Sequence, residues 1–312
     1  MASESVTVEV EGRQLVLTNL SKVLYPQTGF TKAEVIDYYT RIAPVLLPHL
    51  QGRPLTVKRY PNGVEASFFY EKNAPRNTPD WVPTVRLEVP GSTMDRTSID
   101  YLLVTELATL VWLANQAALE LHVPQWRVDC ADTPLPDNPP PVVDQIVFDL
   151  DPGPPASIVE CAEVALLLRD DLLAQGLDPV VKTSGSKGIQ VTAAVQVEHP
   201  QQTSVFAKSL ATQFAESHPK QVVSVMAKNL RHGKVFIDWS QNNTAKTTVA
   251  PYSLRAKEVP SVSTPLRWEE LSEPQKLRFD AGAVLTRVER FGDLFAGALL
   301  RPAPQLPSAG LV

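Results

Sequence analysis

Alternating and continuous apolar stretches predict strands along much of the chain. Residues 6–17 alternate on both sides of Glu11-Gly12, which predicts a short hairpin. Residues 55–72 predict two strands joined through a Pro-Asn-Gly turn. Further strands, most of them apolar enough to be buried, are predicted at residues 98–104, 146–150, 179–182, 189–192 and 234–238.

Apolar residues at helical spacing predict four helices between these strands. Thr31 and Glu34 form a capping box that should open the first helix. Thr105 is the expected N-cap of a second helix that runs to about Glu120. The other two are expected over 157–174, opened by Ser157 and Glu160 and closed by Gly176, and over 202–217. A Pro-rich stretch at 134–141 separates an N-terminal part from the rest.

The composition describes an ordinary globular protein of 312 residues, 44% hydrophobic and 20% charged. The net charge of −5 does not by itself indicate a nucleic-acid partner, although locally clustered basic residues are compatible with one. Cys130 and Cys161 fit no disulfide framework or zinc spacing, and a reducing cytoplasm suits them. Without a signal segment or an apolar run of membrane-spanning length, no membrane partner is expected.

Two carboxylates stand at the end of the predicted strand 146–150. Asp149 and Asp151 are two positions apart, so their side chains should project to the same face. Like charges so close repel each other, and a hard divalent cation with oxygen ligands is the usual remedy. Asp151 alone is also explained by the turn that begins at Pro152-Gly153, but that explanation leaves Asp149 without a role.

A third carboxylate, Asp238, ends the predicted strand 234–238. Placed on a neighbouring strand, it would form one cluster with Asp149 and Asp151. Three carboxylates can hold two divalent ions, which stabilise the attacking and leaving oxygens of a phosphoryl transfer. A metal-dependent glycosyltransferase also uses a D-x-D pair, but it needs one metal and gives Asp238 no role.

Basic and aromatic residues occur on both sides of these carboxylates. Lys58 and Arg59 precede three aromatic residues, an arrangement that suits base stacking and phosphate contact. In the alternative interpretation Phe68 and Tyr70 both face the core, and only Phe69 is exposed.

Several short stretches are suited to binding phosphate. The loop T-S-G-S-K-G at 183–188 offers backbone N–H groups, hydroxyls and a lysine, but it is not a Walker A loop. Lys22 and Lys32 flank the helix start at Thr31, where free N–H groups favour anions, or they are simply two solvated lysines. His122 lies in an apolar strand, where a lone histidine is more often a core residue than a ligand.

The motifs L-S-K-V-L-Y-P, F-D-L-D-P-G, T-S-G-S-K-G and F-I-D-W-S-Q-N occur in this order between residues 16 and 291. In these motifs the chain resembles the polymerase domain of bacterial ligase D, a branch of the archaeo-eukaryotic primase superfamily found in mycobacterial and pseudomonad end-joining repair. The resemblance implies an α+β fold, a primase-like catalytic domain of two packed lobes built on mixed and antiparallel sheets with flanking helices. The lobes would cover about 1–133 and 142–300 of a single domain, followed by a Pro-rich tail at 301–312.

The same resemblance implies a template-dependent nucleotidyltransferase that fills gaps or extends ends in DNA repair. Ribonucleotides would be accepted, manganese favoured over magnesium, and Asp149, Asp151 and Asp238 would bind two divalent cations. Asn19, Lys22 and Lys32 would hold the 5′-phosphate downstream of a DNA gap. Contacts to the nucleoside triphosphate would fall on Lys58, Phe69, His122, Ser184, Lys187, Arg231, Gln241, Lys246 and Arg255.

Other implications of the resemblance concern partners and departures from the family. The Ku end-binding protein and a separate DNA ligase are expected partners, in the nucleoid of a bacterial cytoplasm. Gln190 stands where the family often has histidine, so its role is open. The zinc-binding cysteines of replicative primases are absent, so efficient primer initiation is less expected. The sequence leaves open a stand-alone polymerase or one domain cut from a larger protein. A non-catalytic module that binds DNA ends is an alternative, against which the intact aspartates argue.

Overall fold

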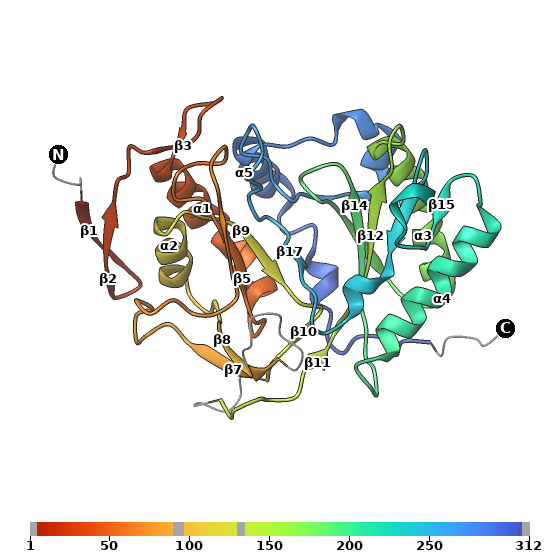
Figure 1. Cartoon of the computed structure of the whole chain (residues 1–312), viewed down its shortest axis with the longest axis horizontal. Coiled ribbons are helices and arrows are strands. Elements are labelled where there is room, and N and C mark those ends of the chain that lie inside the picture. Colours follow the sequence, from red (N-terminus) through yellow and green to blue (C-terminus); the bar gives the residue numbers. More distant parts are fainter. Residues whose placement is uncertain (1–4, 90–96, 130–134, 308–312) are drawn as a thin grey trace.

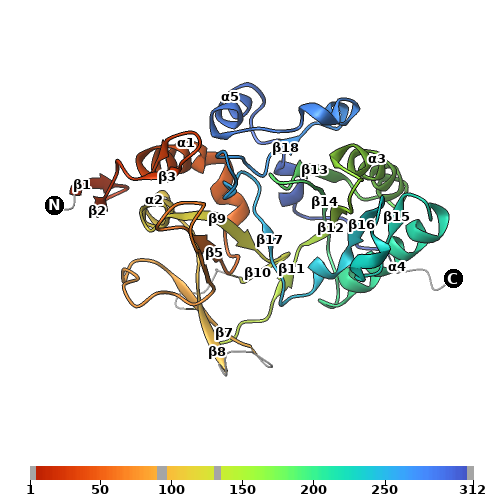
Figure 2. The same cartoon turned by 45° about the horizontal axis from the view of Figure 1, so that its top comes forward.

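The computed structural model describes residues 5–89, 97–129 and 135–307, so Cys130 and the last five residues of the expected tail lie outside it. Two sheets stand next to each other, each with helices on its outer side (Figure 1). Each sheet has its own apolar core, and we call these two halves the first and second lobes. Turning the molecule shows that α5, Ala281–Phe291, lies over the first lobe near α1 (Figure 2).

The first lobe is built on a four-stranded antiparallel sheet with the order β17-β9-β5-β6. Its strands are β5 Thr56–Arg59, β6 Phe69–Glu71, β9 Ala118–Val123 and β17 Thr248–Val249. Helices α1 Lys32–Leu50 and α2 Leu107–Asn115 pack on it. Small two-stranded sheets surround this core: β1 Ser5–Val10 with β2 Arg13–Thr18, β3 Val23–Tyr25 with β4 Phe30–Thr31, β7 Thr84–Glu88 with β8 Ser98–Leu102, and β10 Trp126–Arg127 with β11 Val142–Val143.

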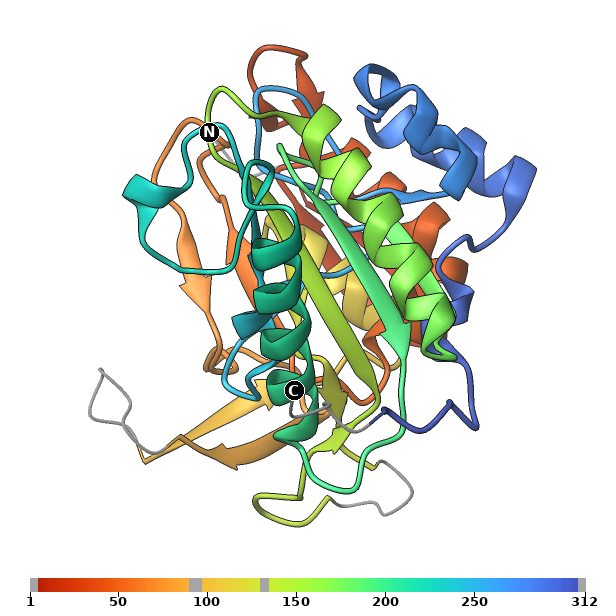
Figure 3. The same ribbon diagram turned by 90° about the vertical axis from the view of Figure 1, so that its right-hand side faces the viewer.

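The second lobe is built on a six-stranded mixed sheet with the order β15-β16-β12-β14-β13-β18. Its strands are β12 Gln145–Pro152, β13 Pro179–Thr183, β14 Ile189–Ala194, β15 Val222–Val223, β16 Val235–Asp238 and β18 Pro265–Leu266. Helices α3 Ile158–Ala174 and α4 Gln202–Ser217 cover one face of this sheet (Figure 3). Short 3₁₀ helices complete the chain: η1 Lys228–Leu230, η2 Trp239–Asn242, η3 Trp268–Ser272, η4 Pro274–Lys276 and η5 Ala296–Leu299.

Local capping signals place two helix starts as predicted. Thr31 and Glu34 form the expected capping box at α1, and Ser157 and Glu160 form the same box at α3. Gly176 follows α3 with a positive φ of 80°, one residue beyond its C-cap. None of the helices within the described ranges has the length and apolar character needed to cross a bilayer.

The predicted helix 105–120 is wrong at both ends. The helix begins at Leu107 after Glu106, not after a Thr105 cap, and it stops at Asn115. Ala117 has a left-handed φ of 57°, and the residues after it form β9, paired with β5 and β17. Pairing on both edges of β9 therefore overrides the helical spacing of this segment.

The two lobes do not divide the sequence at one point. Residues from β17 to Val262, together with α5, return to the core of the first lobe. The segment 142–300 thus contributes to both cores. As a result, residues from the far end of the chain reach the space between the two sheets.

Candidate active site

The predicted carboxylates lie on two central strands of the six-stranded sheet. In the antiparallel pair β12–β16, Asp149 is directly opposite Asp238. Asp151 follows Asp149 by two positions on the same strand, and so projects to the same face. The expectation that Asp238 stands on a neighbouring strand is therefore confirmed.

Burial and mutual repulsion raise the pKa values of Asp149 and Asp151. Burial, with the neighbouring Asp151 as the next cause, raises the pKa of Asp149 to about 7. Burial raises the pKa of Asp151 too; Lys187 opposes this rise, and Asp238 adds to it. A divalent cation bound here would relieve the repulsion and return both groups to the ionised form.

The carboxyl group of Asp238 is held by its own local contacts. One oxygen accepts bonds from the Ser240 backbone N–H at 3.0 Å and from its hydroxyl at 2.5 Å, and the other accepts one from Gln241 Nε2 at 2.9 Å. Lys246 Nζ in turn donates to the Ser240 hydroxyl. No three His, Cys, Asp or Glu side chains in the described parts of the chain are grouped as a metal site. The donor chemistry still fits, because carboxylate oxygens are the ligands that Mg²⁺ and Mn²⁺ prefer.

A pocket of about 200 Å³ opens beside Asp149 and Asp151. Both lobes contribute to its wall, because β9 and β17 belong to the first lobe and β12 and β14 to the second. Its lining is His122, Asp149, Asp151, Ser184, Ser186, Lys187, Gln190, Thr247, Thr248, Val249 and Arg255. Six of the residues assigned by resemblance are thus brought together from distant parts of the sequence, and His122 is one of them.

The loop between β13 and β14 closes one side of this pocket. Ser184 Oγ accepts bonds from the N–H groups of Ser186 and Gly188, which holds the loop in a compact turn. A Cβ at Gly188 would lie 2.3 Å from the Leu150 carbonyl oxygen, so only glycine allows this close approach to β12. Lys187 Nζ donates to the Pro152 carbonyl at 3.4 Å. The serine and lysine of the loop are therefore fixed next to the carboxylates.

Other expected nucleotide contacts lie around the pocket without lining it. Arg231 stacks 3.7 Å over the ring of Phe236 and acts to lower the pKa of Asp151, so its charge is close to the site. Gln241 and Lys246 reach the site through Asp238 and Ser240, as described above. Lys58 connects to it through Glu120, 3.3 Å away.

Three consecutive aromatic residues are exposed on and next to the edge strand β6. Phe69 is 55% exposed, in keeping with a base-stacking role, but Phe68 and Tyr70 are 49% and 51% exposed. The interpretation that Phe68 and Tyr70 both face the core is therefore wrong, because neither side chain packs into any of the hydrophobic cores of the described residues. Phe68 instead stacks on Tyr60 at 5.3 Å between ring centroids.

The expected 5′-phosphate residues lie together at the start of α1. Lys32 is the first residue of the helix and only 5% exposed, and its ammonium donates to the Thr18 carbonyl at 2.6 Å. Lys22 is exposed and donates to Asn62. The carbonyl of Asn19, which has a left-handed φ of 52°, accepts a bond from the N–H of Lys22.

The burial of Lys32, which is 5% exposed, argues against two ordinary solvated lysines. Burial, followed by the charges of Lys22 and Arg59, lowers the pKa of Lys32 to about 8. The interpretation of a solvated surface lysine is therefore wrong for Lys32. A buried cation with other cations beside it gains from an anionic ligand, which fits a phosphate site here.

Sequence reasoning missed a buried lysine behind the carboxylates. Lys182 Nζ donates to Gln190 Oε1 at 2.5 Å, to the Val249 carbonyl at 3.0 Å and to Ser263 Oγ at 2.8 Å. Burial lowers its pKa to about 7, and Gln190 bonds onward to Asp149. Gln190, whose role was open, thus links Lys182 to Asp149. The only sequence signal was a lysine within an apolar strand.

Replacing Asp149 by asparagine should stabilise the metal-free protein at pH 8. Between about pH 4 and 7 folded Asp149 keeps a proton that the unfolded chain releases, so stability falls as pH rises through this window. Asp149→Asn removes that loss, on the order of 2 kcal/mol in the free energy of unfolding, and the gain should shrink toward pH 5. Urea unfolding with a chelator present measures it, with the exposed Asp178→Asn as control. A variant less stable than wild type at pH 8 would contradict the repulsion described above.

Comparisons with known proteins find close relatives for most of the chain. A family model described as "LigD, primase-polymerase domain" matches residues 31–295. The multifunctional non-homologous end joining protein LigD of Mycolicibacterium smegmatis is 44% identical over 285 residues, 90% of this chain and 35% of that protein. The bifunctional non-homologous end joining protein LigD of Bacillus subtilis is 30% identical over 299 residues, 95% of this chain and 46% of that protein. The chain thus spans between a third and a half of the length of these relatives.

A solved structure is similar over almost its full length. It is the polymerase domain from Mycobacterium tuberculosis ligase D in complex with DNA, 41% identical in sequence with a TM-score of 0.84. The match covers 90% of this chain and 96% of that one. This agreement confirms the expected fold, an α+β domain with antiparallel and mixed sheets and flanking helices.

Proposed function

The chain belongs to the family of LigD primase-polymerase domains, and on this basis we propose that it is a template-dependent nucleotidyltransferase acting in end-joining repair of DNA. Its substrates would be gaps or ends of DNA and nucleoside triphosphates. Both lobes contribute to the pocket, so residues 1–300 would act as one catalytic unit. A separate DNA ligase and the Ku end-binding protein would be its partners, in line with the end-joining names of the relatives.

The pocket beside Asp149 and Asp151 is the observation that best supports this function. Carboxylates suited to metal ions line it together with Ser184, Lys187 and Arg255, which supply hydroxyl and cationic groups. Such a pairing of negative and positive groups suits a nucleoside triphosphate together with its metals. A glycosyltransferase gives no role to the exposed aromatic residues of strand β6. A non-catalytic module gives no role to the two carboxylates that repel each other, Asp149 and Asp151.

Each group would have a defined task. Asp149, Asp151 and Asp238 would hold two divalent cations, Mn²⁺ or Mg²⁺, which stabilise the attacking and leaving oxygens when bound. Gln241 orients Asp238 through its hydrogen bond. Phe69 would stack on a base. The triphosphate would be bound by Lys58, His122, Ser184, Lys187, Arg231, Lys246 and Arg255.

Template-directed extension of a primer tests the function. The protein, manganese and labelled nucleotides are incubated with a primer annealed to a template, and the products are separated by length. Extension by the complementary nucleotide is expected. Tight binding of DNA ends without any extension would instead favour the non-catalytic module.

Ribonucleotides should be incorporated at least as well as deoxyribonucleotides. This expectation comes from the family, since no residue described above is assigned to a 2′-hydroxyl. Competition between matched ribo- and deoxyribonucleotide pairs on one template measures the preference directly. A strong preference for deoxyribonucleotides would count against this substrate assignment.

A further inference from the structure

One buried carboxylate, outside the set assigned by resemblance, touches three of the expected nucleotide-binding groups. Glu120 on β9 is 2% exposed. One of its oxygens lies 2.9 Å from His122 Nε2 and 3.3 Å from Lys58 Nζ. The other lies 3.3 Å from Arg255 Nε and accepts the backbone N–H of Ala256 at 3.1 Å. Both carboxylate oxygens are therefore fully used.

The three basic groups come from separate segments. Lys58 is on β5, His122 is on β9 and Arg255 follows β17, so Glu120 joins two strands and a loop of the first lobe. The Arg255 guanidinium also donates to the Ser184 carbonyl in the loop of the second lobe. Through Arg255, Glu120 is therefore linked to Ser184, and this link connects the first lobe with the second.

The negative charge of Glu120 offsets the positive charges of the three basic groups. Despite its burial, contacts with His122, Arg255 and Lys58 hold the pKa of Glu120 well below its usual range, so it remains ionised. Three basic groups without it would repel one another and spread apart. With it, two or three positive charges face one carboxylate, and the excess is left for an anionic ligand.

We propose that Glu120 is a positioning residue that sets Lys58, His122 and Arg255 in the arrangement that receives the triphosphate. The role rests on the proposed function, because it presupposes a nucleotide in the pocket. Glu120 does not line the pocket and would not touch the substrate. It acts through the three groups it holds, by fixing them before the nucleotide arrives.

Glu120→Gln tests the role, because glutamine keeps the shape and one acceptor but removes the charge. On an open primer–template we expect the nucleotide KM to rise about tenfold and kcat to fall about threefold, as the triphosphate loses its joint contacts. A merely structural defect would lower the active fraction, and so kcat, and leave KM unchanged. An unchanged KM would therefore overturn the proposal.

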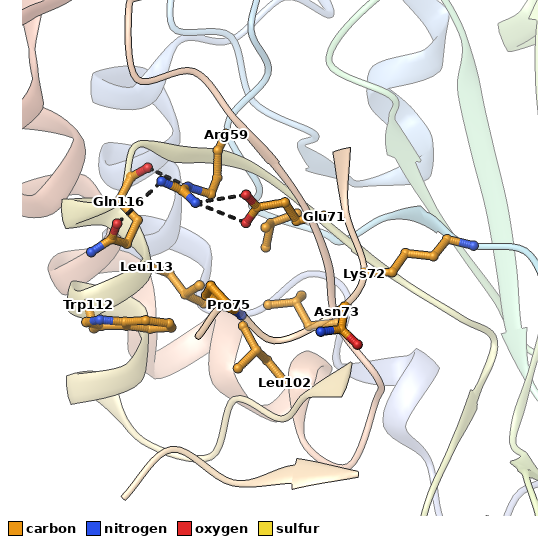
Figure 4. Close-up of a pocket in the computed structure, with 11 residues that line it drawn as sticks. Arg59, Glu71, Lys72, Asn73, Pro75, Leu102, Trp112, Leu113 and Gln116 are labelled. Carbon is orange, nitrogen blue, oxygen red and sulfur yellow. Dashed lines mark hydrogen bonds and ion pairs between the residues drawn. The ribbon is translucent and has the colours of Figure 1, made fainter. Parts of the chain in front are cut away.

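Glu71→Gln is the matched control. Glu71 pairs with Arg59 at 2.9 Å, next to Lys58 in sequence, in a separate small cavity where Arg59 also donates to Gln116 (Figure 4). This control removes a carboxylate charge from an arginine outside the pocket, and KM and kcat should both stay within about twofold of wild type. An equal rise in KM for Glu71→Gln would show a general effect of lost charge and overturn the proposal.

Glu120→Gln leaves buried cations unpaired, so a second comparison tests the role in case this variant folds poorly. Adding Glu120→Gln to Lys58→Met removes one cation together with the carboxylate. The pair should have a nucleotide KM at least about threefold above that of Lys58→Met alone, because His122 and Arg255 still lose their anchor. Equal KM values would overturn the proposal. Wild-type extension in the same assay separates the two questions: an inactive wild type counts against the proposed function itself.

Discussion

Replacement of Asp149, Asp151 or Asp238 by alanine should abolish nucleotide addition while leaving the protein folded. The three carboxylates stand on paired strands, and Asp149 and Asp151 share a face. Removing one takes away charge and geometry that the other two cannot replace, so the expected loss is at least about 10³-fold in rate. The apo protein should lose little stability and can gain some, because the carboxylates repel one another.

Rates of single-nucleotide addition and thermal unfolding, measured on the same samples, check this prediction. Asp178→Ala, an exposed aspartate in the same lobe, is the control and should behave as wild type. A loss of only about tenfold in any of the three variants, roughly 1.4 kcal/mol of barrier, is too small for a metal ligand. Such a result would show that the residue is not a metal ligand.

The double change Lys22→Ala with Lys32→Ala should erase most of the preference for a gap with a downstream 5′-phosphate over one ending in 5′-OH. A terminal phosphate carries two charges and gains more from the same site than an internal phosphodiester does. The first three N–H groups of α1 are already bonded, to the carbonyls of Lys22 and Leu20 and to the Thr31 hydroxyl, so the two ammonium groups would supply the field. Glu34 is occupied by its bond to the Thr31 backbone. Two charge-assisted contacts suggest a loss of about 2–4 kcal/mol at low salt, and less as salt rises.

The pKa of Lys32 adds a pH dependence to this preference. Lys32 titrates at about pH 8 in the free protein, and a bound phosphate would raise that pKa. Above pH 8 the protein must take up a proton to bind, so the preference for the 5′-phosphate should weaken as pH rises from 7 to 9.

Binding of matched gapped DNAs by the wild type and the double variant measures both effects. Lys220→Ala with Lys276→Ala removes two exposed lysines elsewhere and serves as the control. Addition on an open primer–template should change little in the Lys22/Lys32 variant, because the three aspartates are intact. If that variant still separates 5′-phosphate from 5′-OH as wild type does, the phosphate site lies elsewhere.

Local signals predicted helices at the positions of α1 to α4 but missed α5, although Asp280 caps it, and one pairing rule predicted the centre of the site. The capping boxes at Thr31 and Ser157 involve residues only three positions apart, so the sequence alone shows where α1 and α3 begin. The two-residue spacing of Asp149 and Asp151 gives their shared face in the same way. The placement of Asp238 beside them required only that two similar strands be neighbours.

Long-range contacts account for what the sequence did not show. The end of α2 and the start of β9 depend on strands β5 and β17, far away in the chain. The exposure of Phe68 and Tyr70 depends on the fact that no other part of the described chain packs a core against them. Lys182 looks like an isolated charge in an apolar strand, and Glu120 like the end of a predicted helix. Only the folded chain shows the groups they contact.

Insertion of one nucleotide into a gap, with each of the four template bases in turn, tests the central claim most directly. The assay contains manganese and all four nucleotides, each with a separate label, and compares wild type with Asp149→Ala. We expect the wild type to insert the nucleotide complementary to each template base, and Asp149→Ala to insert none. Insertion that ignores the template base, or insertion that persists in Asp149→Ala, would contradict a template-directed transferase centred on these carboxylates.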